Sequence, residues 1–149
     1  MGVVELDRLF ERFEGKERPA DRSSWRDLLP DANALRWPQL LERRRVVLLA
    51  EAASGKTTEF RSRAEALGAA GNAAFFLDLA ALAVGGLTAC LNAALRPRFD
   101  AWRQSTGDAW FFLDAVDELR LTRRTLDAAL NRLAHELGQG LDRARIFIS

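Results

Sequence analysis

The sequence predicts an α/β fold around a mainly parallel sheet of about four strands. Runs of large apolar residues recur along the chain, as expected of strands that are buried on both faces of a parallel sheet. Between them lie segments whose apolar residues repeat every three or four positions, which is the pattern of helices packed on a sheet. The chain has 149 residues, of which 48% are hydrophobic and 29% are charged. This size and composition fit one compact domain with a single core.

The predicted strands share a continuous aliphatic or aromatic character over most of their length. They are residues 46–50, 74–77, 110–113 and 145–149. The first helical segment, 56–67, places Phe60, Ala64 and Leu67 on one face, and Gly68 and Gly71 are expected to end it. Since helical segments alternate with the strands, the pattern favours βαβ units.

Two further helices are predicted from leucine spacing. In the first of them, Leu87, Leu91 and Leu95 line one face, and Pro97 is expected to end the helix. The second is defined by leucines that share one face and by the glycines that follow them: Leu126, Leu130, Leu133 and Leu137, then Gly138 and Gly140.

Residues 1–45 are expected to form a short amphipathic helix and a wrapped arm, and residues 46–149 the α/β domain. The helix is predicted from apolar residues spaced by three and four positions: Leu6, Leu9, Phe10 and Phe13. Three prolines then interrupt the chain: Pro19, Pro30 and Pro38. Two tryptophans of the arm, Trp25 and Trp37, are its expected anchors.

The charge balance argues against a nucleic-acid partner. Lys and Arg number 22 against 21 Asp and Glu, so the net charge of +1 is too small to favour a polyanion. Short arginine clusters are expected to be solvated, with phosphate contacts or an arginine finger as the alternative: Arg43, Arg44 and Arg45, and Arg120, Arg123 and Arg124. His135 lies opposite the leucine face of its helix, so we expect it to be solvated rather than catalytic.

The chain is expected to be cytoplasmic, with no membrane partner. Its one cysteine, Cys90, excludes an internal disulfide framework and a Cys-rich zinc site, and fits a reducing compartment. Leucines lie near Cys90 in the sequence, so we expect a small core residue rather than a nucleophile. The apolar stretch 73–95 contains Asp78, which is costly inside a bilayer, and its glycine pair divides it into pieces too short to span one.

A phosphate-binding loop is predicted between the first strand and the first helix. Residues 50–58 match the pattern of Gly or Ala, four residues, then Gly-Lys-Thr. In such a loop, backbone N–H groups surround phosphate oxygens at the positive end of a helix, the lysine bridges the β and γ oxygens, and the threonine hydroxyl binds Mg²⁺. The expected nucleotide-binding residues are Ala52, Ala53, Ser54, Gly55, Lys56, Thr57 and Thr58, with Thr57 also at the metal.

Two alanines depart from the commoner form of this loop. Ala50 replaces its first glycine, and Ala53 occupies a position where related loops often have glycine. If either position needs a positive φ, alanine costs about 1 kcal/mol or more and lowers the affinity for nucleotide. The alternative interpretation of the segment is an ordinary strand-to-helix turn that reads Gly-Lys-Thr.

An acidic motif follows the third predicted strand. Asp114 comes directly after four large apolar residues, at the sheet edge where ligands of α/β proteins bind. Asp114 is expected to hold Mg²⁺, directly or through water, while Glu118 or Asp117 orients the attacking water and accepts its proton. The alternative is a strand that ends in a solvated acidic turn.

The loop and the acidic motif together resemble the NACHT group within the STAND class of P-loop ATPases. The resemblance covers residues 46–149 and none of residues 1–45. It implies a three-layer P-loop NTPase-like domain that binds ATP or ADP with Mg²⁺ and hydrolyses ATP slowly by itself. It further implies the switch domain of a larger bacterial signalling or defence protein that self-associates. The residues it assigns are Lys56 and Thr57 for phosphate and Mg²⁺, Asp114 for Mg²⁺, and Asp117 with Glu118 for the hydrolytic water.

The same resemblance implies the strand order 1-4-3-2. It also implies a polar sensor residue at or just past the strand 145–149, and a fifth strand beside the first. Since the sequence ends at Ser149, we expect either a longer protein or a partner to cover the edge of the first strand.

A GTPase is disfavoured, because residues 114–117 lack the glycine of the GTPase switch motif and no guanine-reading motif is present. The alternative to an ATPase is a degenerate P-loop module that acts in protein–protein interaction without hydrolysis.

Overall fold

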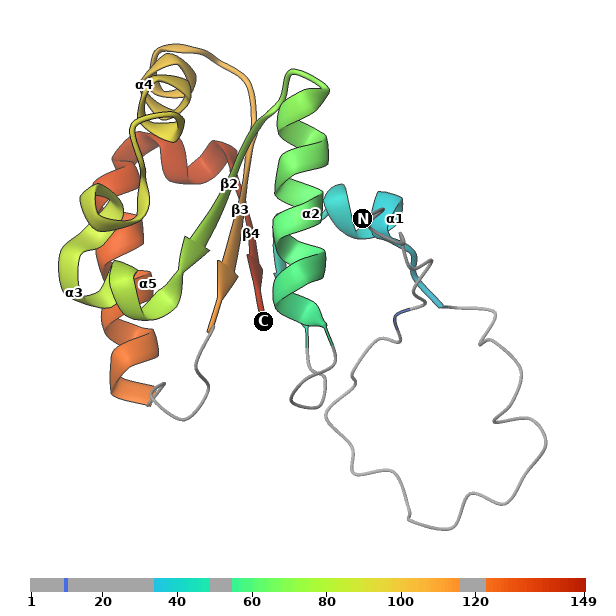
Figure 1. Cartoon of the computed structure of the whole chain (residues 1–149), viewed down its shortest axis with the longest axis horizontal. Helices are drawn as coiled ribbons and strands as arrows, with labels where there is room; N and C mark the ends of the chain where they lie inside the picture. Colours follow the sequence, from blue (N-terminus) through green and yellow to red (C-terminus); the bar gives the residue numbers. More distant parts are fainter. Residues whose placement is uncertain (1–9, 11–33, 49–54, 116–122) are drawn as a thin grey trace, which may run out of the picture. The chain divides into compact units, whose positions relative to one another are not determined.

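The described strands form one sheet in the order β1-β4-β3-β2. This computed structural model describes residue 10 and residues 34–48, 55–115 and 123–149. The strands are β1 (Arg45–Val47), β2 (Ala73–Asp78), β3 (Ala109–Asp114) and β4 (Ala144–Ile148). Each neighbouring pair is parallel. The predicted α/β fold and its strand order 1-4-3-2 are therefore confirmed (Figure 1).

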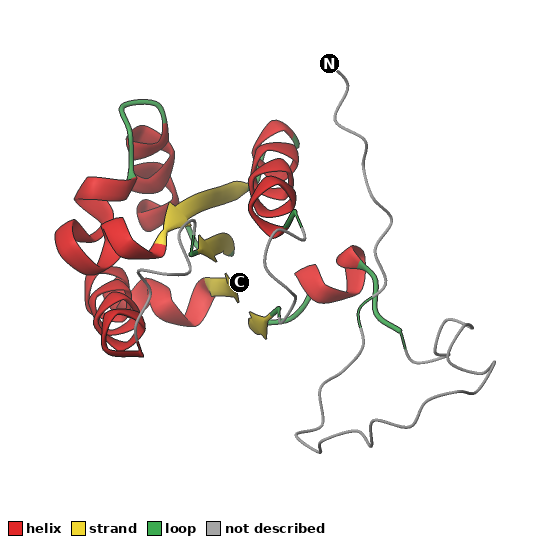
Figure 2. Cartoon of the chain, turned by 60° about the horizontal axis from the view of Figure 1, so that its bottom comes forward, coloured by secondary structure: helices red, strands yellow, loops and turns green. Residues whose placement is uncertain are grey.

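Helices cover both faces of this sheet, which gives three layers. On one face lies α2 (Lys56–Ala69), and on the other lie α3 (Leu79–Cys90), α4 (Leu95–Gln104) and α5 (Arg123–Leu137), as Figures 1 and 2 show. A 3-10 helix, η3 (Gly138–Arg143), joins α5 to β4. Because both faces of the central strands are covered, their sequences are continuous apolar runs rather than alternating ones.

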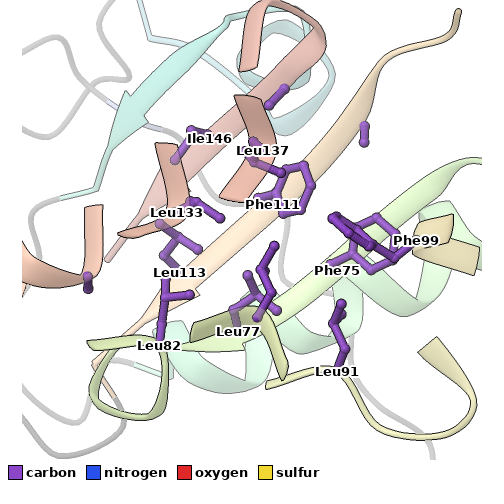
Figure 3. Packing of buried hydrophobic residues seen from close by; sticks show 14 of the residues in the cluster. Phe75, Leu77, Leu82, Leu91, Phe99, Phe111, Leu113, Leu133, Leu137 and Ile146 are labelled. Atoms are coloured by element: carbon purple, nitrogen blue, oxygen red, sulfur yellow. The ribbon is translucent and has the colours of Figure 1, made fainter. Parts of the chain in front are cut away.

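Successive side chains of β3 belong to two different apolar layers. On the α2 side, Phe112 packs against Phe60 and stacks on Phe147, with ring centroids 5.3 and 5.0 Å apart. On the opposite side, Phe111 stacks on Phe75 at 5.2 Å and belongs to the larger core beneath α5 (Figure 3). All five rings are fully buried. Since side chains alternate along a strand, this packing holds the register of β3.

The predicted leucine face of α5 is confirmed. Leu133 and Leu137 are buried in the larger core, and Leu126 and Leu130 pack against it while partly buried. His135 is exposed, as expected from its place opposite this face.

The prediction of a single helix that contains Leu87, Leu91 and Leu95 is wrong. Here α3 ends at Cys90, and α4 begins at Leu95 as a separate helix that is bent by 81° from α3. Pro97 lies in the first turn of α4 and ends no helix. It is tolerated there because the first N–H groups of a helix have no partner within the helix.

The helix α3 is broken at Gly86, whose φ of 66° and ψ of −161° are open almost only to glycine. Two side chains of α5 bind the backbone on either side of this break. Arg132 donates to the carbonyl of Val84 at 2.7 Å. Glu136 accepts from the N–H of Leu87 at 2.7 Å. The predicted division at the glycine pair is therefore present, and α5 satisfies backbone groups beside it.

The stretch 73–95 consists of β2, α3 and the residues that lead into α4. Among the described residues, no single helix has the length and apolarity needed to cross a membrane, and α3 with α4 meets that test only as a bent pair. In this fold Leu79, Leu82 and Leu87 of α3 are buried in the core.

The chain divides into two units, Met1–Arg43 and Arg44–Ser149, and the division falls two residues before the predicted boundary. In the first unit, Phe10 and Leu35 exchange backbone hydrogen bonds of 2.8 and 2.7 Å as an antiparallel bridge. The prediction of a helix is therefore wrong at Phe10. The other residues on which that helix was predicted, Leu6, Leu9 and Phe13, lie outside the described residues, and so does Trp25. Trp37, in α1 (Trp37–Leu41), is buried and packs edge-on against Phe10 at 5.3 Å.

Candidate phosphate and metal site

The carboxyl ends of the parallel strands meet at one edge of the sheet, where α2 also begins (Figure 1). There β2 ends at Asp78, β3 ends at Asp114, and Ser149 follows β4. The register places Asp78 directly beside Asp114. Since ligands of open α/β sheets bind at this edge, its polar residues form the candidate site.

Gly55 turns the chain into α2 with a left-handed backbone, φ 82° and ψ 13°. Its carbonyl accepts a hydrogen bond from the N–H of Glu59 at 3.0 Å. Glycine takes this conformation without strain, whereas a side chain there costs about 1–2 kcal/mol. The first N–H groups of the helix are left without intrahelical partners at its positive end, which suits an anion such as phosphate.

The hydroxyl of Thr57 joins the loop to the acidic motif. Thr57 Oγ1 donates a hydrogen bond to Asp114 Oδ2 at 2.5 Å, across 57 positions of sequence. Thr57 lies in the first turn of α2, and Asp114 is the last residue of β3. The two residues that the sequence assigned to a metal ion therefore lie in contact.

Asp114 is 2% exposed, and it is the one buried polar or charged side chain in the part of the chain that the structure describes. A buried carboxylate is costly unless hydrogen bonds satisfy its oxygens. Here the hydroxyl of Thr57 donates a hydrogen bond to Oδ2, and the hydroxyl of Ser149 donates one to the other oxygen, Oδ1, at 3.0 Å. The two hydroxyls offset part of the cost of burying Asp114.

The resemblance implied a polar residue at or just past the strand 145–149, but Ser149 itself was not named among the predicted site residues. Its backbone N–H donates to the carbonyl of Leu113 at 3.0 Å, which continues the pairing of β3 with β4 by one residue. The sequence feature that could have identified Ser149 is its place as a polar residue directly after the apolar run 146–148. Parallel pairing then places that residue beside the last residue of β3.

The oxygens of Thr57 and Asp114 fit Mg²⁺. This ion binds hard oxygen ligands, and it commonly takes one or two protein carboxylates together with substrate phosphates and water. No group of three or more His, Cys, Asp or Glu side chains among residues 34–48, 55–115 and 123–149 could hold a metal ion. Thr57 and Asp114 can contribute to a Mg²⁺ site that nucleotide phosphates and water complete.

The other predicted site residues divide into two sets. Lys56 is half-buried and Thr58 is exposed, both in the first turn of α2. The remaining predicted residues lie outside the described ranges: Ala52, Ala53, Ser54, Asp117 and Glu118. The structure thus brings together Gly55, Lys56, Thr57 and Asp114 at one edge.

Two of the clustered arginines lie at the opposite edge of the sheet, where β1 begins. Arg44 donates to the carbonyl of Asp142. Arg45 donates to the carbonyl of Leu141 at 3.3 Å. Both carbonyls belong to η3, whose last carbonyls lack partners within the helix. Arg44 and Arg45 therefore hold the start of β1 to η3, away from the edge that carries Asp114.

Cys90 is half-buried, and its thiol donates weakly to the carbonyl of Asp78 at 3.7 Å. Burial, followed by the nearby charges of Asp78 and Glu136, raises the pKa of Cys90 to about 11. The thiol therefore stays protonated at neutral pH, and only the thiolate is a good nucleophile. Cys90 also packs against the core while partly buried, as expected of a small apolar residue.

Comparison of the chain with models of known protein families, with curated proteins and with solved structures found no match.

Proposed function

We propose that this chain is an ATP-binding switch domain that hydrolyses ATP slowly. The observation that carries the proposal is the hydrogen bond between Thr57 and Asp114, because it joins a phosphate-loop sequence to an acidic strand end at the ligand-binding edge of the sheet. By the NACHT-type resemblance, the domain belongs to a larger cytoplasmic signalling or defence protein that self-associates.

Each described residue of the site has a role in this proposal. Gly55 opens α2, so that its first N–H groups can bind phosphate oxygens, and Lys56 reaches the β and γ oxygens. The hydroxyl of Thr57 donates a hydrogen bond to Asp114, which leaves the lone pairs of the hydroxyl oxygen available for a cation. A bound Mg²⁺ would neutralise part of the negative charge of the phosphates.

The proposal is tested by titrating the chain with ATP, with and without Mg²⁺, and repeating the titration on Lys56→Ala. The substitution is expected to weaken ATP binding at least tenfold, since it removes a charge-assisted hydrogen bond worth about 1.5–3 kcal/mol. Lys16→Ala is the matched control, because Lys16 is the only other lysine of the chain and lies outside the loop. It is expected to bind ATP like the parent chain.

Equal, weak binding of ATP by the parent chain and by Lys56→Ala would contradict this function. It would favour instead a degenerate module that acts through protein–protein contacts.

Hydrolysis is tested separately at the two acids that follow Asp114 in the sequence. A general base contributes about a hundredfold or more to such a reaction. We therefore expect Glu118→Gln or Asp117→Asn to lower the rate of phosphate release about a hundredfold, while ATP binding stays within a few-fold of the parent. Full turnover in both variants would remove these acids from the mechanism.

A further inference from the structure

The hydroxyl of Ser149 is directed at the same carboxylate that meets the phosphate loop. It donates to Asp114 Oδ1 at 3.0 Å, while Thr57 donates to Oδ2 at 2.5 Å. The carboxylate of Asp114 is thus held from two sides, by α2 through one oxygen and by the end of β4 through the other.

The position of Ser149 is itself set by the sheet. Its backbone N–H donates to the carbonyl of Leu113 at 3.0 Å, and Leu113 pairs with Ile148 in the register of β3 with β4. The buried ring of Phe147 stacks on Phe112 and holds the two strands together just before this point. The hydroxyl therefore approaches Asp114 from a residue whose backbone is hydrogen-bonded to β3.

Holding both oxygens has a consequence for metal binding. A carboxylate with one unsupported oxygen can rotate about its last side-chain bond, because that torsion is broad. Partners that orient a metal ligand without touching the metal usually change metal affinity by about ten- to a hundredfold when they are removed. Ser149 has the geometry of such a partner for Asp114.

We infer that Ser149 is a positioning residue, which orients the Asp114 carboxylate for the Mg²⁺ that accompanies ATP. This inference rests on the proposed function. It assigns to the end of β4 a part in metal-dependent nucleotide binding, distinct from direct contact with the phosphates.

The test is the Mg²⁺ dependence of ATP binding in Ser149→Ala. The Mg²⁺ concentration needed for half-maximal tightening of ATP binding is expected to rise about tenfold. Affinity for ATP in the presence of EDTA is expected to stay unchanged, because Ser149 acts only through the metal ligand. A variant damaged in its fold would instead lose affinity in both conditions.

Two variants serve as controls. Ser149→Thr keeps the hydroxyl and is expected to restore the parent's Mg²⁺ dependence. Ser105→Ala removes a serine hydroxyl that donates to the carbonyl of Trp102 at 2.8 Å, remote from Asp114, and is expected to change neither measurement.

Unchanged Mg²⁺ dependence in Ser149→Ala would overturn the positioning role while leaving the proposed function intact. Equal loss of affinity with Mg²⁺ and with EDTA would overturn it too, since the serine would then act on nucleotide or fold. Failure of the parent chain itself to bind ATP would overturn both proposals together.

Discussion

Asp114→Asn is expected to lower the rate of phosphate release from ATP by on the order of a thousandfold. Stabilisation of transition-state charge by a bound metal ion is worth several kcal/mol, and each 1.36 kcal/mol changes a rate tenfold. Asparagine keeps the shape of the side chain and one acceptor oxygen, so it can still receive a hydrogen bond from Thr57 or Ser149. What it loses is the negative charge that attracts the cation.

The matched control for this prediction is Asp78→Asn. Asp78 lies beside Asp114 in the register of β2 with β3, so the control removes the same charge from the same edge of the sheet. Its carboxylate caps α3 by accepting from the N–H of Ala81 at 2.9 Å, and asparagine caps a helix about as well. We expect the control to turn over ATP at the parent's rate. If both variants lost a similar share of their turnover rate, the total negative charge at this edge of the sheet would be the cause. Asp114 would then have no specific role as a metal ligand.

Gly86→Ala is expected to lower the free energy of unfolding by about 2.5–6 kcal/mol. The backbone conformation of Gly86 costs a non-glycine residue about 1–3 kcal/mol. A Cβ atom there would lie 2.1 Å from Glu136 Oε1 and would displace that carboxylate. Glu136 would then lose its hydrogen bond from Leu87, and bonds of this charged kind are worth about 1.5–3 kcal/mol.

Gly138→Ala separates these two causes. Gly138 also has a positive φ, 52°, but a Cβ atom there would meet no atom within 4 Å. Its expected cost is therefore only the backbone term, about 1–2 kcal/mol. Urea denaturation of both variants measures the difference. Equal destabilisation would show that the contact between Glu136 and the break in α3 contributes nothing measurable.

The sheet was predictable because burial on both faces leaves a local mark. Continuous apolar runs such as 110–113 have few explanations other than a central parallel strand. Their ends were equally clear, because Asp78 and Asp114 interrupt the apolar character at the last residue of each strand. The candidate site could be located for the same reason, since its residues follow strands or begin a helix.

The helices between β2 and β3 were predicted less well. Pro97 can end one helix or lie in the first turn of the next, and the difference depends on which backbone N–H groups find partners. The sequence around it does not contain that information. The break at Gly86 likewise depends on Arg132 and Glu136, which lie far along the chain on α5.

By itself, the sequence determined the α/β class, the strands and the two motifs, since all of these follow from local periodicity and residue type. Only the tertiary structure decided that Thr57 and Asp114 touch, and that Ser149 holds the other oxygen of Asp114. These hydrogen bonds join residues 57 and 35 positions apart. Whether such residues meet depends on strand order and register, and those follow from the packing of the whole core rather than from any single segment.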